Sequence, residues 1–246
     1  SVDYILNDFS IMELSLSRSQ MENIASLSAE EERWSLIGIC FHKILAPMLK
    51  RSIAKELIIL HDQLSRPPIE INKQHFARRI KCLPGSKFPL NYANINNNHA
   101  HKLGAYDYDV KDPLSLAKLL VPRFMANFTG FDETMDFSAC LLVIIEASSS
   151  ARARDLARNV KNYRNVWAHG GFNLWTDAEF SKAIKEMNCL VEHSYLSDAD
   201  KKNVFDDLEY FRKSKDYLAR TDEENQSDYE AVSTESTEDW SSGYFS

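Results

Sequence analysis

Glycine is scarce in this chain, with only 7 among 246 residues. Proteins built from many short strands and tight turns need glycine wherever the backbone takes a positive φ angle. The shortage therefore favours long, uninterrupted helices. Hydrophobic residues make up 44% of the chain and charged residues 26%, a balance that supports a packed core and is not typical of a disordered protein.

Closely spaced cysteines are also missing. The chain has Cys40, Cys82, Cys140 and Cys189, so the CxxC pairs of zinc ribbons and thioredoxin-like proteins are absent. The even number permits two disulfides, whereas the positions on apolar helix faces favour buried free thiols. No signal-peptide pattern is present, and we therefore expect a reducing compartment, the cytoplasm.

Long hydrophobic runs are missing as well. The longest run covers residues 139–145, whereas a helix needs about 20 apolar residues to cross a bilayer. We expect no contact with a membrane.

Basic residues are absent from the last part of the chain. Residues 221–246 carry eight acidic side chains and no lysine or arginine. Removing their charge of −8 from the total of −7 leaves residues 1–220 at +1. We expect this tail to be disordered because it has no means of packing. The nearly neutral body neither indicates nor forbids a nucleic-acid partner.

Capping residues and apolar spacing predict an all-α fold. Ser28 and Glu31 match a capping box in front of a long first helix, which Pro47 should kink or break. Asp112, Asp136, Ser148–Ser150 and Thr176 match caps of later helices. The expected helices cover residues 29–66, 72–82, 114–127, 137–147, 151–169 and 198–218, and one more follows the Thr176 cap through Phe180, Ile184, Met187 and Val191.

These elements suggest one main domain with extensions. Residues 1–28 are an N-terminal extension or the edge of an upstream region, and residues 29–196 form the helical domain. Residues 197–220 add a C-terminal helix in front of the tail. The chain opens without methionine, and we expect further domains of a longer protein.

Residues 67–112 are the least regular part of the sequence. A long irregular segment inside a domain is commonly functional or mobile. Its His99 and His101 are a conceivable metal pair, but a polar loop without neighbouring cysteine or acidic side chains favours solvated histidines. We expect no metal and no cofactor.

One segment carries residues suited to chemistry. Residues 162–171 read Asn-Tyr-Arg-Asn-Val-Trp-Ala-His-Gly-Gly, with Arg164, Asn165 and His169 at the end of a helix whose other face is apolar. Arg164 and His169 diverge by about 140° around the helix, so a relaxed helix end or a partner subunit is needed to bring both to one phosphate. The chain's one locally basic stretch lies upstream and contains Arg152, Arg154, Arg158 and Lys161.

Structural interpretations of the same residues stay open. Histidine near a helix C-terminus is favoured by the macrodipole, and Arg164 could pair with a carboxylate on a neighbouring helix. Glu146 is a candidate partner for an arginine. The basic stretch is commonly only a solvated face. Tyr163 and Trp167 fall on the apolar period of the helix, which favours a place in the core over base stacking.

The segment at 162–171 and its context resemble the HEPN family (higher eukaryotes and prokaryotes nucleotide-binding). The resemblance spans residues 30–195 and is carried by the stretches 33–47, 163–169 and 176–180. It is greatest to the subgroup found in the DAZ-interacting zinc-finger ubiquitin ligase. The family signature is an arginine, a polar residue and a histidine near the end of the third main helix.

The resemblance implies a metal-independent endoribonuclease that works as a homodimer. Such an enzyme cleaves single-stranded RNA by attack of the 2′-hydroxyl on the adjacent phosphorus, which leaves a 2′,3′-cyclic phosphate. Arg164, Asn165 and His169 would be catalytic, and Arg158 and Lys161 would guide the RNA backbone. The alternative is a non-catalytic HEPN module that binds RNA or nucleotide or mediates dimerisation.

Overall fold

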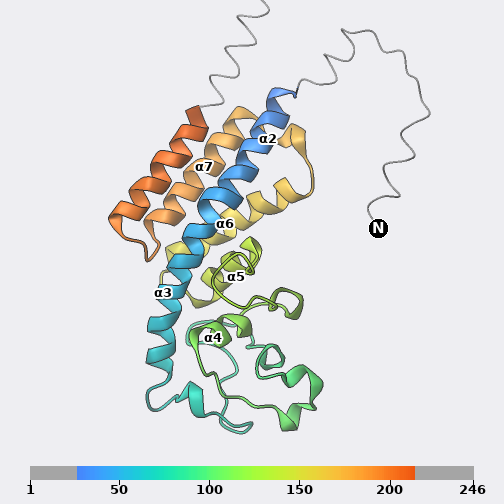
Figure 1. Ribbon diagram of the computed structural model, residues 1–246, viewed down its shortest axis with the longest axis vertical. Coiled ribbons are helices and arrows are strands. Elements are labelled where there is room, and N and C mark those ends of the chain that lie inside the picture. The colour runs from blue at the N-terminus through green and yellow to red at the C-terminus, as the bar shows by residue number, and fades with distance from the viewer. Residues whose placement is uncertain (1–26, 214–246) are drawn as a thin grey trace, which may run out of the picture.

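The computed structural model describes residues 27–213, and within this range the fold is all-α, without a β-strand. The predicted fold class is confirmed (Figure 1). The predictions for the N-terminal extension, the acidic tail and the end of the last helix lie outside the described residues. The α-helices are α2 (Ala29–Ile39), α3 (Ala46–Leu64), α4 (Pro113–Leu119), α5 (Phe137–Ala147), α6 (Ala151–Ala168), α7 (Asp177–Glu192) and helical residues 198–213.

The predicted N-cap residues form hydrogen bonds with the first turns of their helices. Ser28 Oγ accepts from the Glu31 amide at 3.2 Å while the Ser28 amide donates to Glu31 Oε2 at 2.8 Å, which completes the capping box of α2. Side-chain oxygens of Asp112, Asp136 and Thr176 accept amide hydrogens in the first turns of α4, α5 and α7.

The first long helix continues through Pro47 by widening rather than breaking. A π-helical turn, η2 (Cys40–Leu45), joins α2 to α3, and the Ala46 amide donates to the Phe41 carbonyl five residues earlier. Proline has no amide hydrogen and its ring would press on the carbonyl four residues back in an α-helix. The wider turn accommodates this ring, and the path bends between α2 and α3 (Figure 1).

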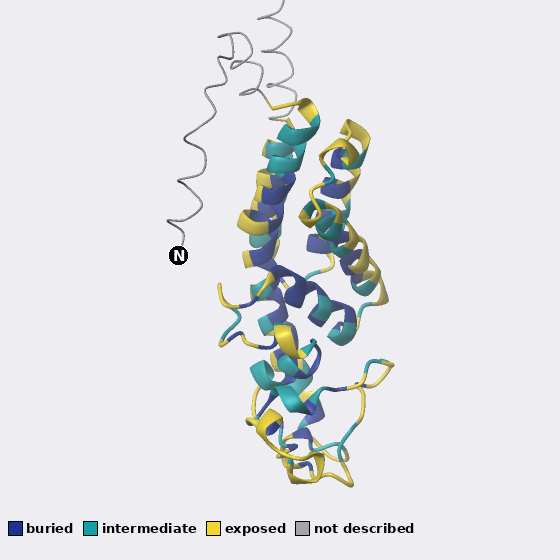
Figure 2. Cartoon of the chain, turned by 90° about the vertical axis from the view of Figure 1, so that its right-hand side faces the viewer, coloured by how far each residue is buried: buried dark blue, intermediate teal, exposed yellow. Residues whose placement is uncertain are grey.

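The helices form a bundle at one end of an elongated molecule. In Figure 1, α2, α6, α7 and the helix at 198–213 lie together, and α3 leads away to α4 and the irregular segment at the other end. Buried residues line the inward faces (Figure 2). The predicted apolar stripes supply this core, since the following side chains are buried: Leu156, Val160, Phe180, Ile184, Met187, Val191, Val204 and Leu208.

One predicted helix is shorter than expected, and another does not form. The helix expected at 114–127 ends at Leu119, because Pro122 disfavours the helical conformation at Val121, and only the short 3₁₀ turn η7 (Arg123–Met125) follows. No α-helix forms at 72–82, where the structure has the 3₁₀ turn η3 (Ile71–Lys73) and non-helical turns.

Two buried side-chain amides organise the irregular segment instead. Gln74 Oε1 accepts from the Ile80 amide at 2.7 Å, and its Nε2 donates to the Ile71 and Tyr108 carbonyls. Asn98 Nδ2 donates to the Tyr92 and Asp107 carbonyls, both at 2.8 Å. These bonds satisfy backbone groups that a helix would otherwise pair. The further 3₁₀ turns are η4 (Tyr92–Asn94), η5 (Asn98–Ala100) and η6 (Leu103–Ala105).

All four cysteines are free. Cys40 and Cys140 are buried, and burial raises the pKa of each thiol to about 12. Cys189 is half-buried. Cys82 is exposed, contrary to the expectation of buried thiols, because it lies in the irregular segment rather than on an apolar helix face.

Candidate functional site

The end of α6 is fixed by its terminal residues. Gly170 takes a positive φ of 69°, the left-handed conformation that ends a helix and that glycine adopts without strain. His169 caps the helix, with its amide donating to the Asn165 carbonyl at 3.1 Å, and its side chain is exposed. The 3₁₀ turn η8 (Phe172–Leu174) then leads to α7.

Two tryptophans tie this helix end to α2. Their rings stack with centroids 5.4 Å apart, and each indole nitrogen donates to the other residue's carbonyl. Trp167 also lies against Gly38, where a Cβ would come within 2.8 Å of the indole ring. Trp167 and Tyr163 are partly buried and pack on the core, as their helical spacing predicts.

Arg164 has no ionic partner among residues 27–213. Its side chain is half-buried, and Nε is fully buried without a hydrogen-bond acceptor. The described structure therefore does not contain the predicted alternative of an ion pair with a neighbouring helix. An unpaired, partly desolvated guanidinium is suited to an anionic ligand, because it presents donors in a fixed fork.

Arg164, Asn165 and His169 lie at the same helix end, but within the described residues their side chains are not hydrogen-bonded to one another. In the described structure no hydrogen bond links Arg164 to His169, as their spacing around the helix leads one to expect. Asn165 is half-buried, as Arg164 is, whereas His169 is exposed.

The structure places a histidine that sequence reasoning missed against Trp167, three residues after Arg164. The His42 ring, from the π-helical turn, lies with its centroid 5.1 Å from that of Trp167 and 5.9 Å from that of Phe137. Burial and the charge of Arg164 lower the pKa of His42, and Asp136 opposes them. His42 falls within the 33–47 stretch of the resemblance, but apolar spacing does not reveal a π-helical turn.

Three basic side chains of α6, Arg154, Arg158 and Lys161, follow one face at helical spacing. Asn165 continues the same face, so it runs from the start of α6 toward the motif. Arg158 forms an ion pair with Asp155 at 2.7 Å. Lys161 is half-buried and has no ion pair within the described range.

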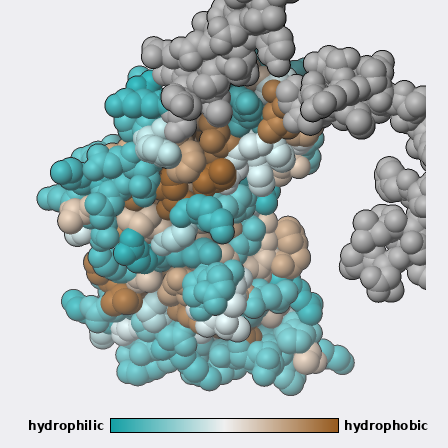
Figure 3. Space-filling view, turned by 45° about the horizontal axis from the view of Figure 1, so that its top comes forward, coloured by the Kyte–Doolittle hydropathy of each residue, from teal (hydrophilic) through white to brown (hydrophobic). Residues whose placement is uncertain are grey.

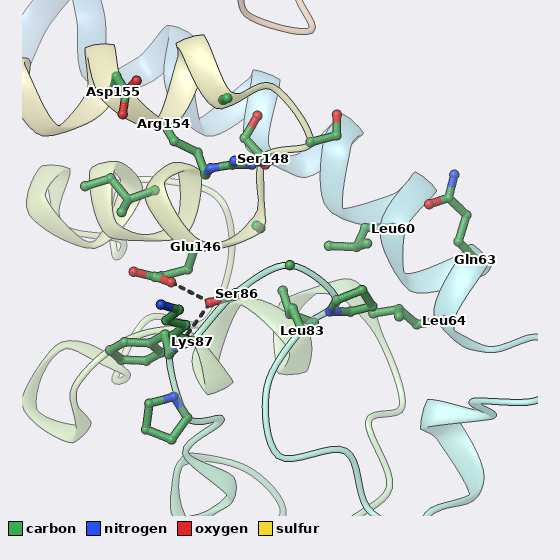
Figure 4. Close-up of a pocket in the computed structure, with 18 of the residues that line it drawn as sticks. Leu60, Gln63, Leu64, Leu83, Ser86, Lys87, Glu146, Ser148, Arg154 and Asp155 are labelled. Carbon is green, nitrogen blue, oxygen red and sulfur yellow. Dashed lines mark hydrogen bonds between the residues drawn. The ribbon is translucent and has the colours of Figure 1, made fainter.

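A cleft of about 1000 Å³ opens at the other end of this face. It lies between α3, the segment 83–89, the end of α5 and the start of α6 (Figure 4). Arg154 donates to the Ser148 carbonyl at 2.6 Å, and Glu146 accepts from the Ser86 hydroxyl at 2.9 Å. The expected pairing of Glu146 with an arginine is therefore wrong, because a serine from the irregular segment takes its place.

His99 and His101 are both exposed. Among residues 27–213, no three His, Cys, Asp or Glu side chains are grouped so that they could hold a metal ion. In the same range no helix combines the length and apolar character needed to cross a membrane.

Comparison of the chain with protein-family models, with curated proteins and with solved structures finds no match.

Proposed function

We propose that this protein is a metal-independent endoribonuclease of the HEPN type, which cleaves single-stranded RNA and leaves a 2′,3′-cyclic phosphate. The observation that carries the proposal is the unpaired guanidinium of Arg164 near the end of α6, the helix that His169 caps with an exposed side chain. Both belong to the segment that resembles the family signature.

These side chains suit the chemistry of phosphodiester cleavage. Arg164 is permanently charged and stabilises the negative charge that builds on the phosphoryl oxygens in the transition state. His169 is exposed, and an imidazole is the side chain most often used for proton transfer. Asn165 can hydrogen-bond the scissile phosphate. Arg158 and Lys161 follow the helix face that leads to the motif and can attract the RNA backbone.

A homodimer fits the surface around the motif. Val166, Phe172 and Leu174 are 37%, 41% and 54% exposed beside the end of α6. Apolar side chains gather on the face seen in Figure 3. Exposed apolar groups of this kind are typical of contact surfaces, and a symmetric contact here would bring two motifs together. The four free cysteines fit a reducing compartment, the cytoplasm.

The test is incubation of the protein with single-stranded RNA in EDTA, followed by analysis of the fragment ends. We expect cleavage with 2′,3′-cyclic phosphate ends, and a loss of roughly 10²-fold or more in His169→Ala. The matched control is His193→Ala, which alters another exposed histidine at a helix C-cap. Equal cleavage by His169→Ala and the parent would assign the activity to another site.

The second candidate is a non-catalytic module that binds RNA or nucleotide. The lack of a direct link between Arg164 and His169 within one chain favours it. A parent protein that binds RNA but does not cleave it, even when two copies are covalently joined, would establish this alternative.

A further inference from the structure

We propose that His42 is a second catalytic residue of this site, the base that takes the proton from the attacking 2′-hydroxyl at a phosphate bound by Arg164. The inference rests on the proposed ribonuclease function and goes beyond it, because it adds a residue from another helix outside the motif.

The position of His42 is set by rigid neighbours. It stands in the π-helical turn η2, and such turns inside α-helices are frequent at functional sites. Its ring packs on Trp167 and Phe137, and Trp167 is in turn fixed by Trp34 through two hydrogen bonds. His42 is nevertheless exposed, so a ligand can reach its imidazole.

The surroundings of His42 favour the neutral form of its imidazole, which is the form that can accept a proton. Arg164 from α6, Lys50 from α3 and Lys43 from η2 lower the pKa of His42 together with burial, and Asp136 at the start of α5 raises it. The net effect is a lowered pKa, so the ring is neutral at pH 7. A general base must be neutral before it acts.

The two histidines flank Arg164 on different sides. With 3.6 residues per turn, Trp167 lies about 60° to one side of Arg164 and His169 about 140° to the other. His42 packs on the Trp167 side. Attack on phosphorus in line places the entering and leaving oxygens on opposite sides of the phosphate, so one histidine is needed on each side. His42 takes the Trp167 side, and His169 reaches the other side through a relaxed helix end or from a second copy of the chain.

The reaction balances with these two groups. The bond from the 2′-oxygen to phosphorus forms while the bond from phosphorus to the 5′-oxygen breaks. His42 receives the proton of the 2′-hydroxyl, and His169 in its protonated form donates a proton to the leaving 5′-oxygen. The products are a 2′,3′-cyclic phosphate and a 5′-hydroxyl, and exchange with solvent restores both rings.

The first experiment measures kcat/KM against pH for the parent, His42→Gln and the control His101→Gln, an exposed histidine of the irregular segment. The parent should lose activity below a midpoint under about pH 6.5, the ordinary histidine value. His42→Gln should be roughly 10²-fold slower and should lack this acid limb, and His101→Gln should match the parent. Cleavage by folded His42→Gln at the parent's rate and with the same pH profile would overturn the proposal.

A second experiment follows the His42 ring by NMR without turnover. A single-stranded DNA oligonucleotide lacks the 2′-hydroxyl, so it can bind but not react. Its phosphate should raise the pKa of His42, and in the free protein Arg164→Met should raise it too because a neighbouring positive charge is removed. A pKa that does not respond to bound oligonucleotide contradicts contact with the phosphate. Loss of cleavage in His169→Ala but not in His42→Gln rejects His42 alone, and a parent without cleavage rejects both proposals.

Discussion

Trp34 and Trp167 bond to each other twice: Trp34 Nε1 donates to the Trp167 carbonyl at 2.9 Å, and Trp167 Nε1 donates to the Trp34 carbonyl at 3.0 Å. The pair joins residues 133 positions apart in the chain. Each indole buries its apolar body and satisfies its single donor at the same time. The contact fixes the end of α6 against α2, and thereby the side on which Arg164 lies.

Trp167→Phe should therefore lower the free energy of unfolding by about 1–3 kcal/mol. Phenylalanine keeps an aromatic ring but loses the donor and part of the buried area. Denaturant unfolding measures the change. The comparison is Phe124→Leu in η7, which is 75% exposed and should be nearly silent. Equal midpoints for the two variants would show that the tryptophan pair is not a stabilising contact.

Gly38→Ala should destabilise the protein even though alanine is the better helix former. A Cβ at this position would meet Trp167 ring atoms at 2.8–2.9 Å. Overpacking of this kind costs about 1–3 kcal/mol. Gly104→Ala is the control, because nothing lies within 4 Å of its Cβ. In a Trp167→Phe background the cost should shrink, since the clashing indole atoms are gone. A full cost in that background would mean that the strain arises elsewhere.

Arg164→Lys should reduce RNA cleavage by roughly 10²-fold, because lysine keeps the charge but cannot offer two parallel donors. The control is Arg152→Lys on the exposed side of α6. Circular dichroism should show that both variants stay helical. Cleavage at the parent rate by Arg164→Lys would leave only a nonspecific electrostatic role for this residue.

Asn98→Ala should lower the free energy of unfolding by about 3 kcal/mol or more, because it removes three hydrogen bonds in a buried place. The exposed Asn127→Ala is its matched control. Hydrogen exchange should become faster in the irregular segment, at the Asp107 amide above all, since Asn98 Oδ1 is its acceptor at 2.9 Å. Unchanged protection there would show that the segment does not depend on this amide.

Glu56→Gln should stabilise the protein increasingly as the pH rises. Burial raises the pKa of the Glu56 carboxyl, although bonds from Ser148 and Ser149 oppose the shift. A folded pKa above the unfolded one gives stability that is complete below the unfolded pKa of about 4.5 and is lost as the pH rises through the folded value. Glutamine has no charge to lose. The melting temperatures of the two proteins should diverge by a few degrees between pH 4 and pH 8. Melting temperatures that change with pH in the same way in both proteins would contradict a raised pKa of Glu56.

The sequence was a good guide where local chemistry decides the structure. Asp136 and Ser150 mark helix starts by their side-chain oxygens, and Gly170 marks an end by its left-handed backbone. The helices at 137–147 and 151–168 therefore follow from short-range signals. The positions of Arg164 and His169 at a helix end follow in the same way.

The irregular segment and the position of His42 depend on contacts between residues far apart in the chain. Gln74 bonds groups as far away as Tyr108, and no local pattern reveals such a partner. The meeting of His42 with Trp167 depends on a widened helical turn and on the crossing of two helices. Both lie beyond what spacing along one helix can predict.

The π-helical turn at Cys40–Leu45 makes chain length a determinant of the site. The turn holds one residue more than an α-helical turn and absorbs it as a local bulge, so α2 and α3 nearly keep their phase across it. Removal of one residue would let the turn relax to an ordinary α-helix, which would leave Trp34 near its place but would remove the bulge that carries His42. In related chains, a one-residue gap at this turn would accordingly signal a changed position of this histidine, even where every motif letter is kept.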